Sequence, residues 1–454
     1  MKNILFSAML SVCMIFSIAH SSKAQQRPNI VVLFVDDLGW ADLGYRNSLF
    51  ETPNIDQLSE DGLDFERAYI ASPSCSPSRA SILTGKEPVR IGMVRHIIEE
   101  DNKMAYLKEG YNMWRKDPVQ MPSINHLPLE EITYAERLKE FGYYNMFIGK
   151  WHSGTDKYHP IHQGFDAQYG TSNYGHPKGY YQPFFGKGNP LSNIGDDQYL
   201  TDVLTDEAER FISSYHKNKP FMLNLWYYNV HGPHHGRKDL VDKYKAKGMD
   251  SKYAEYGAMV EAMDESVGRV RAALEKKGIA DNTVILFTSD QGGYFTNYPL
   301  RGKKNGGYTL NEGGARVPFI MYYPGLTKPG TKCHIPIQTL DVYPTLVEIA
   351  SGKDQKDKQI NGVSLMPLLK GEALNKRALY FLRSYEDQYS AIIEGDWKLI
   401  KYHSGNVQLY NVKEDMGEVS NLVFVYPKKT KELKKKLDAW EVEAVPDFTN
   451  SLSN

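Results

Sequence analysis

Short runs of β-branched and aromatic residues alternate along the chain with longer segments of mixed polarity. From residue 28 onward, the runs that predict strands cover residues 29–35, 144–148, 221–227, 283–288 and 319–323. The longer segments predict helices over residues 53–60, 131–141, 199–216, 252–277 and 337–350. Strands that alternate with helices in this way indicate an α/β fold, in which a large, mostly parallel sheet is sandwiched by helices.

The pattern changes after Gly352, where residues 353–358 form a polar and highly charged stretch. Beyond it, short apolar runs predict antiparallel strands at 378–383, 390–394, 398–402 and 408–411, followed by a helix at 430–441. We therefore divide the chain into a main α/β domain, residues 25–352, and a small C-terminal antiparallel sheet plus helix subdomain, residues 353–454. No repeat of fixed period is present, which argues against a solenoid or propeller.

The first 24 residues predict an export signal. Lys2 precedes an apolar run over residues 4–19, and a polar stretch then leads to the small residue Ala24. This order is typical of a cleaved secretory signal peptide. The run is shorter than the roughly 20 apolar residues that span a bilayer, and no second candidate follows it. We therefore expect a secreted or periplasmic protein with no integral membrane segment in the mature chain.

Charge and cysteine content narrow the choice of function. Lys and Arg number 54 against 55 Asp and Glu, a net charge of -1, so the chain as a whole is not suited to attract nucleic acid or an anionic membrane. Of its three cysteines, Cys13 lies in the signal peptide, which leaves Cys75 and Cys333. Two cysteines are too few for a disulfide framework. We expect Cys333 to be a packed free thiol.

Acidic side chains follow two of the predicted strands. Asp36 and Asp37 come directly after the first strand, and Asp290 and Gln291 come after the strand at 283–288. In open parallel sheets, ligands bind beyond the carboxyl ends of the strands. Hard oxygen ligands from separate loops suit Ca²⁺, which takes 6 to 8 of them. These residues therefore predict a calcium site.

The most specific signal is an eleven-residue run that begins at Cys75. Pro77 fits the first turn of a helix, whose free backbone amides attract an anion. The run resembles the signature of the formylglycine-dependent sulfatases, the type I or arylsulfatase-like members of the alkaline-phosphatase-like superfamily. It reads Cys75-Ser76-Pro77-Ser78-Arg79-Ala80-Ser81-Ile82-Leu83-Thr84-Gly85. The resemblance implies that a formylglycine-generating or radical maturase enzyme oxidises Cys75 to formylglycine (3-oxoalanine).

Other segments are similar to further motifs of this family. Lys150 and His152 lie in a Gly-Lys-Trp-His segment, and in the family this lysine and histidine contact the formylglycine and the sulfate. His231, in Asn-Val-His-Gly-Pro, matches the histidine that faces the leaving group. The segment before Glu-Gly-Gly implies a catalytic lysine at Lys304, although the spacing leaves its neighbour Lys303 open. The resemblance also implies that Arg79 helps to carry the charge of the sulfate.

The calcium ligands depart from the family in one place. The resemblance implies that calcium is bound by Asp36, Asp37 and Asp290 and by an oxygen of the formylglycine made from Cys75. The family usually has Asn or His as a further ligand at the position where this chain has Gln291. A glutamine amide oxygen can still bind calcium, although its longer side chain changes the reach.

The predicted function is the hydrolysis of sulfate esters, as in bacterial carbohydrate sulfatases. Export and an aromatic segment around His176 and Lys178 favour a sulfated carbohydrate, contacted by these two residues. One alternative is a phosphonate monoester or phosphodiester hydrolase on the same scaffold. Another, of a different class, is an unmodified glycan-binding protein without catalysis. The glycan, the hydroxyl that carries the sulfate, and exo or endo action stay open.

Overall fold

The computed structural model describes residues 27–99, 105–108, 110–115, 121–186, 188–383 and 387–445. The predicted signal peptide therefore lies outside the described residues. The centre of the fold is an eight-stranded sheet whose strand order is β13-β2-β12-β10-β1-β9-β7-β8. In the order of the sheet these strands are β13 (Thr331–Cys333), β2 (Leu63–Phe65), β12 (Phe319–Tyr322), β10 (Thr283–Ser289), β1 (Asn29–Val35), β9 (Phe221–Trp226), β7 (Tyr144–Gly149) and β8 (Ala167–Tyr169).

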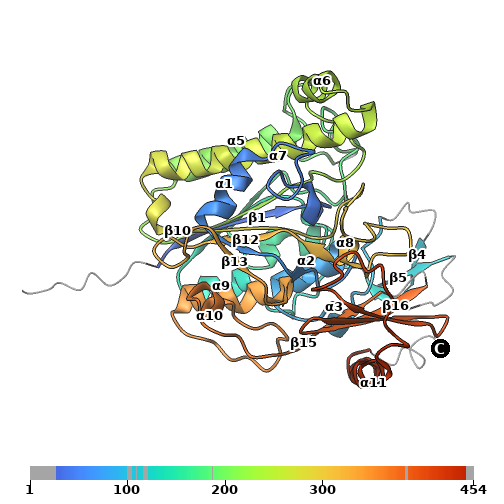
Figure 1. The fold of residues 1–454 in the computed structure, drawn as a ribbon. Coiled ribbons are helices and arrows are strands. Elements are labelled where there is room, and N and C mark those ends of the chain that lie inside the picture. The colour runs from blue at the N-terminus through green and yellow to red at the C-terminus, as the bar shows by residue number, and fades with distance from the viewer. Residues whose placement is uncertain are drawn as a thin grey trace, which may run out of the picture.

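Helices cover both faces of this sheet (Figure 1). All seven residues of β1 are buried, as expected for a central parallel strand. Its side chains alternate between two apolar cores, one on each face of the sheet. One core contains α1 (Pro53–Asp61), α5 (Leu200–Ser214), α6 (Lys238–Ala246) and α7 (Ser251–Lys277). The other contains α2 (Cys75–Thr84), α3 (Pro88–Ile91), α4 (Tyr134–Glu140), α9 (Val342–Ser351) and α10 (Met366–Leu369).

The predicted fold class is confirmed, with two local corrections. β12 runs antiparallel to β10, because the chain turns back after β10 and enters β12 from the same end of the sheet. The helix predicted from residue 337 begins only at Val342, since Ile337 and Gln338 form strand β14 and pair with β3 (Ala68–Tyr69). Hydrophobic spacing reveals neither strand direction nor such a short pairing.

Three smaller sheets complete the fold. The C-terminal subdomain is a four-stranded antiparallel sheet against which α11 (Pro427–Ala444) packs (Figure 1). Its strands are β15 (Ala378–Leu382), β16 (Gln388–Glu394), β17 (Trp397–Tyr402) and β18 (Val407–Asn411). The other two sheets are β11-β3-β14 and β4-β5-β6. They include β11 (Arg316–Val317), which follows α8 (Glu312–Ala315), and β4 (Ala105–Lys108), β5 (Tyr111–Trp114) and β6 (Ser123–Ile124).

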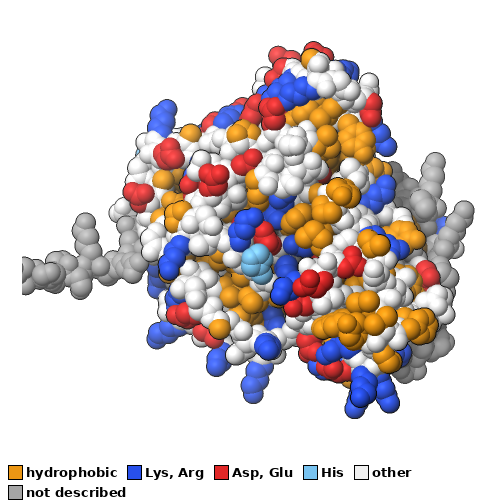
Figure 2. Space-filling model, viewed as in Figure 1, with side chains coloured by type: hydrophobic (Ala, Val, Ile, Leu, Met, Phe, Trp, Pro, Cys, Tyr) orange, Lys and Arg blue, Asp and Glu red, His pale blue; other side chains and the backbone are white. Residues whose placement is uncertain are grey.

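The surface agrees with the balanced composition. Figure 2 shows basic and acidic side chains interspersed over the visible face. Within the described ranges, no helix is both long and apolar enough to cross a bilayer.

Candidate active site

The polar residues that follow separate strands converge at the carboxyl edge of the large sheet. Asp36 follows β1, Lys150 follows β7 and Asp290 follows β10, and all three side chains are fully buried. Asp290 Oδ1 accepts a hydrogen bond of 3.1 Å from the backbone amide of Asp37. The parallel register of β1 with β9 and β10 brings these loops together.

Helix α2 begins at Cys75 and delivers its side chain to the same place. Gln291 Nε2 donates a hydrogen bond of 2.7 Å to Cys75 Sγ, and Sγ lies 3.9 Å from Asp36 Oδ1. Burial raises the pKa of the Cys75 thiol to about 12. The unmodified side chain is therefore protonated at neutral pH, and an S–H group is a weak nucleophile.

Arg79 lies beneath this cluster, one helical turn beyond Cys75 and without exposure to solvent. Its Nε and one terminal nitrogen donate hydrogen bonds of 3.0 and 2.8 Å to Asp290 Oδ2. The other terminal nitrogen donates 2.8 Å to the carbonyl oxygen of Lys150. Arg79 thus ties α2 to the loops after β7 and β10.

Two lysines pair with the two adjacent aspartates. Lys150 Nζ donates to Asp36 Oδ2, and Lys304 Nζ donates to Asp37 Oδ2. Burial lowers the pKa of Lys304, but the Asp37 carboxylate more than offsets this, so the pKa lies above its ordinary value. Lys303, the alternative considered from the sequence, is exposed and does not line the cavity described below. Of the two lysines, the fold therefore brings Lys304 into the cluster.

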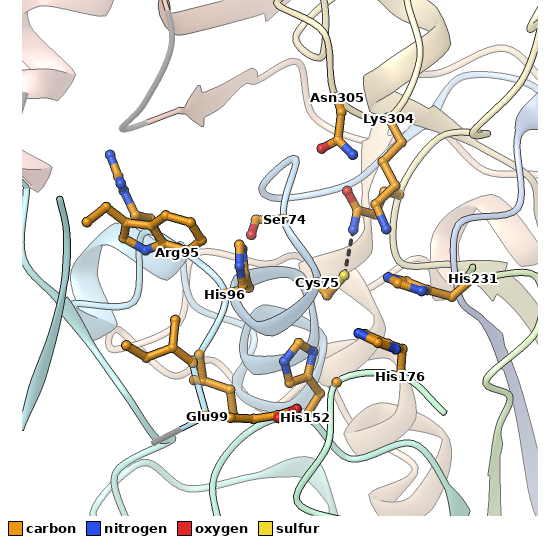
Figure 3. Close-up of a pocket in the computed structure, with 15 residues that line it drawn as sticks. Ser74, Cys75, Arg95, His96, Glu99, His152, His176, His231, Lys304 and Asn305 are labelled. Atoms are coloured by element: carbon orange, nitrogen blue, oxygen red, sulfur yellow. Dashed lines mark hydrogen bonds between the residues drawn. The ribbon is translucent and has the colours of Figure 1, made fainter. Parts of the chain in front are cut away.

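Figure 3 shows His152, His176 and His231 on one side of the space around Cys75 and His96 on another. His231 Nδ1 contacts Gly232 O at 2.6 Å, so this nitrogen carries the proton and leaves Nε2 free, 3.8 Å from Asp37 Oδ2. The ring of His176 is stacked on that of His231 at 5.2 Å. Burial lowers the pKa of both His152 and His231 well below 6.5, so both are neutral at neutral pH.

Backbone strain also concentrates here. Asp37 and His152 have φ values of 66° and 50°, in the left-handed region that residues other than glycine rarely adopt. Such conformations persist only where the surrounding structure enforces them, and they cluster at functional sites.

A cavity of about 540 Å³ opens above Cys75. We call its two sides the reacting wall and the outer wall. The reacting wall comprises Cys75, His152, His176, His231, Gln291, Lys304 and Asn305, and the outer wall comprises Arg95, His96, Ile97, Ile98, Glu99 and Trp114. Figure 3 shows Arg95, His96 and Glu99 across the cavity from His231 and Lys304.

The outer wall was not predicted from the sequence, and the two residues predicted to contact the substrate lie in different places. Trp114 packs edge-on against His96, with ring centroids 4.9 Å apart. The only signal was the aromatic run in β5, which carries no motif. Of the two predicted substrate residues, His176 lines the cavity, whereas Lys178 is exposed outside it, with Nζ 6.0 Å from the ring centroid of Tyr174.

The cluster fits a divalent cation. Asp36, Cys75 and Asp290 offer ligand atoms that all lie within 4.8 Å of one another. Asp37 Oδ1 is buried and has no hydrogen-bond partner among the described residues. A concentration of buried carboxylates needs compensating positive charge, and hard oxygens are what calcium prefers.

Comparisons with known proteins agree with this geometry. The family model described as Sulfatase matches residues 28–352, and the model described as N-sulphoglucosamine sulphohydrolase, C-terminal, matches residues 308–443. The chain is 31% identical to N-acetylgalactosamine-6-sulfatase of Mus musculus over 389 residues, 80% of this chain and 70% of that protein. It is also 30% identical to a sulfatase of Formosa agariphila, over 97% of this chain and 93% of that protein.

A solved structure extends the likeness to three dimensions. The crystal structure of Ps i-CgsB in complex with k-i-k-neocarrahexaose matches with a TM-score of 0.79 and 28% identity, over 94% of this chain and 100% of that one. The match of the Sulfatase model covers most of the chain, and the residues that line the cavity all lie within the matched range. The chain therefore belongs to the sulfatase family and is a sulfuric ester hydrolase.

Proposed function

We propose that this protein is an exported, calcium-dependent sulfatase that removes sulfate from sulfated carbohydrates through a formylglycine made from Cys75. The observation that carries the proposal is the position of Cys75. It begins α2 at the bottom of the cavity, with its Sγ between Asp36 and Gln291. The motif that a maturase reads is intact around it.

Thiol chemistry supports the need for modification. A thiol that accepted a sulfuryl group would have no second oxygen through which to expel it. A hydrated formylglycine has two hydroxyl groups on one carbon, and it supplies both the nucleophile and the means of release. We therefore assign the modification to Cys75 and name the maturase as a required partner.

We assign calcium to Asp36, Asp37, Asp290 and Gln291, together with residue 75. The support is the convergence of ligand atoms from Asp36, Cys75 and Asp290, the adjacent position of Gln291, and the Oδ1 of Asp37, which has no partner among the described residues. Calcium would supply positive charge that stabilises the sulfate oxygens and the nucleophile. Arg79 bonds to Asp290 and to the carbonyl of Lys150, so we assign it the work of holding both in place.

We assign the proton transfers to Lys304, His231 and His152. The raised pKa of Lys304 keeps its ammonium protonated, so it can give a proton to the departing sugar oxygen. His231 presents Nε2 at the same side of the cavity. His152 is neutral and its Nδ1 has no partner among the described residues, which suits a base that takes a proton near residue 75. Lys150, beside Asp36, adds positive charge near the sulfate.

The carbohydrate assignment rests on the relatives and on the cavity. One relative is named for N-acetylgalactosamine 6-sulfate, and one similar structure holds a neocarrahexaose. The outer wall offers Trp114 and His96 as aromatic surfaces and Arg95 and Glu99 as polar groups, a mixture that is typical of sugar binding. We propose His176 as a sugar contact.

The test is sulfate release. The chain is expressed with a maturase, the aldehyde at residue 75 is verified by mass spectrometry, and a panel of sulfated oligosaccharides is offered with calcium. We expect release by the wild type and by Cys333→Ala, whose cysteine lies at the far edge of the sheet in β13, and none by Cys75→Ala. Turnover of phosphonate or phosphodiesters without sulfate release, with the aldehyde present, would refute the proposal.

A further inference from the structure

The loop that carries Lys304 runs from Arg301, which we call its first stem, to Glu312, its second stem. The C-terminal subdomain holds the first stem. Arg301 donates hydrogen bonds of 3.1 Å to the backbone carbonyl of Glu418 and 3.2 Å to the hydroxyl of Tyr410. Both acceptors belong to the C-terminal subdomain. Gly313 N donates 2.7 Å to the carbonyl of Arg301, so the two stems of the loop lie side by side.

The second stem is held by a buried ionic cluster. Lys398 Nζ, on β17, lies 2.9 Å from Glu312 Oε1 and 3.1 Å from Glu418 Oε1, and all three side chains have no solvent exposure. The backbone amide of Glu312 donates 2.7 Å to Glu418 Oε2. Tyr69 and Arg316 complete the cluster on the other carboxylate oxygen of Glu312.

Lys398 points to the main domain because of its place on the strand. Side chains alternate between the faces of a strand. Lys398 therefore shares a face with Ile400, which packs in the core that includes Tyr69 and Leu310. Lys401 lies on the opposite face and pairs with Asp438 and Glu441 of α11.

A third contact with the subdomain holds the loop directly before its second stem. Leu310 N donates 2.8 Å to Gln388 Oε1, and Gln388 Nε2 donates 2.7 Å to Asn311 Oδ1. Gln388 is the first residue of β16 and is fully buried. The loop from Arg301 to Glu312 is thus bound to the subdomain at both stems and beside one of them. The backbone amide of Lys304 also donates 2.9 Å to Gly293 O in the main domain, and the small sheet adds to this by holding the ends of the loop.

We propose that Lys398 is a positioning residue, which acts through Glu312 and Glu418 to hold the Lys304 loop so that the Lys304 ammonium meets the departing oxygen. The inference rests on the proposed role of Lys304. Lys398 is buried and does not line the cavity, and within the described residues it makes no hydrogen bond or ion pair with Cys75 or with any residue that does.

The test compares two leaving groups. A sugar alkoxide needs a proton as it departs, whereas 4-nitrophenolate departs without one. In Lys398→Met we expect kcat for a sulfated sugar to fall by about 10- to 100-fold, the scale that a displacement of about 1 Å costs. We expect KM to change little, and we expect turnover of 4-nitrophenyl sulfate to be nearly retained. Lys398→Arg, which keeps the charge, should recover most of the loss.

Two further variants keep the test decisive if Lys398→Met folds poorly. Arg301→Met removes only the hydrogen bonds of the first stem and should show the same preference for the better leaving group. Lys401→Met, on the opposite face of β17, is the matched control and should treat both substrates like the wild type.

Equal losses on both substrates in Lys398→Met and Arg301→Met would overturn the proposal, because they would indicate general damage. Failure of the wild type to release sulfate from either substrate would instead refute the proposed function. The two failures are therefore distinguishable.

Discussion

The two walls of the cavity are built in different ways. Several residues of the reacting wall follow strands of the large sheet or begin α2, as Cys75, His231 and Gln291 do, and Lys304 and Asn305 come from a longer loop after β10. The outer wall comes from the 93–99 segment and from β5, which belongs to a separate three-stranded sheet. Much of the reacting wall is thus set by the central sheet and α2, whereas the outer wall comes from elements outside that sheet.

This difference suggests that the reacting wall carries out the chemistry and that the outer wall selects the substrate. Groups that transfer protons or bind a metal must be held within a few tenths of an ångström, which a packed parallel sheet achieves. Apart from His176, the groups proposed to contact the sugar lie on separate elements, where they can vary without disturbing that geometry. Changes in the reacting wall should therefore affect kcat, and changes in the outer wall should affect KM.

The largest expected effect follows from removing the modified residue. Cys75→Ala should lower sulfate release by more than about 10³-fold, because removal of a nucleophile leaves only the residual catalysis of the remaining site. Free sulfate is measured with the best oligosaccharide of the panel. Thermal unfolding of the variant should match the wild type, and retained release would contradict the assignment of residue 75.

Removal of the metal should have the next largest effect. We expect a calcium chelator to lower activity by about 10²-fold or more and to lower the melting temperature. The reason is that Asp36, Asp37 and Asp290 would lose a bound cation that adds to the charge of their basic partners, Lys150, Lys304 and Arg79. Added Ca²⁺ should restore both. Activity and melting temperature that are indifferent to chelation would count against a calcium site.

Replacement of the proton donor should come third. Lys304→Met should lower kcat on a sulfated sugar by about 10²-fold, within the range of general acid catalysis, and should affect 4-nitrophenyl sulfate much less. Lys303→Met is the matched control, because Lys303 is exposed and lies outside the cavity. A larger loss in the Lys303 variant would reverse the assignment.

A change in the outer wall should be weaker and of another kind. Trp114→Ala should raise KM for the oligosaccharide by about tenfold or less, the value of one aromatic contact, and leave kcat unchanged. Steady-state kinetics on the oligosaccharide and on 4-nitrophenyl sulfate measure this, since the aryl ester is too small to need the same contact. A drop in kcat alone would remove the distinction between the two walls.

The smallest expected effect concerns pH and stability. Burial lowers the pKa of His96 to about 4, below the ordinary value near 6.5. The unfolded chain therefore binds a proton first as the pH falls, so this residue costs stability progressively from about pH 6.5 down to pH 4. The free energy of unfolding, measured with urea, falls for both proteins between pH 7 and pH 5.5. For His96→Gln we expect this fall to be about 1 kcal/mol smaller than for the wild type. Equal losses would refute the shift.

Much of the main domain could be predicted from the sequence. Fully buried strands such as β1 appear as continuous apolar runs, and the polar residues directly after them must lie at the same edge of the sheet. This local rule was enough to predict that Asp36 and Asp290 lie close together. Cys75 needed only a contiguous motif. In each case the information lies within a few neighbouring residues.

Other features depend on contacts between distant segments. Whether Lys303 or Lys304 enters the cavity depends on the path of the loop from Arg301 to Glu312. Contacts with residues more than 75 positions away in the sequence determine this path, such as the hydrogen bond between Leu310 and Gln388. The outer wall likewise required the packing of β5 against the 93–99 segment.

The sequence by itself therefore determined the α/β class, the strand ends that carry Asp36 and Asp290, and the motif at Cys75, because period and local order encode them. Only the tertiary structure decided which lysine enters the cavity, which residues face the sugar and how Lys398 reaches Glu312. The physical reason is that burial and pairing of charges are properties of the packed chain, and no local pattern records them.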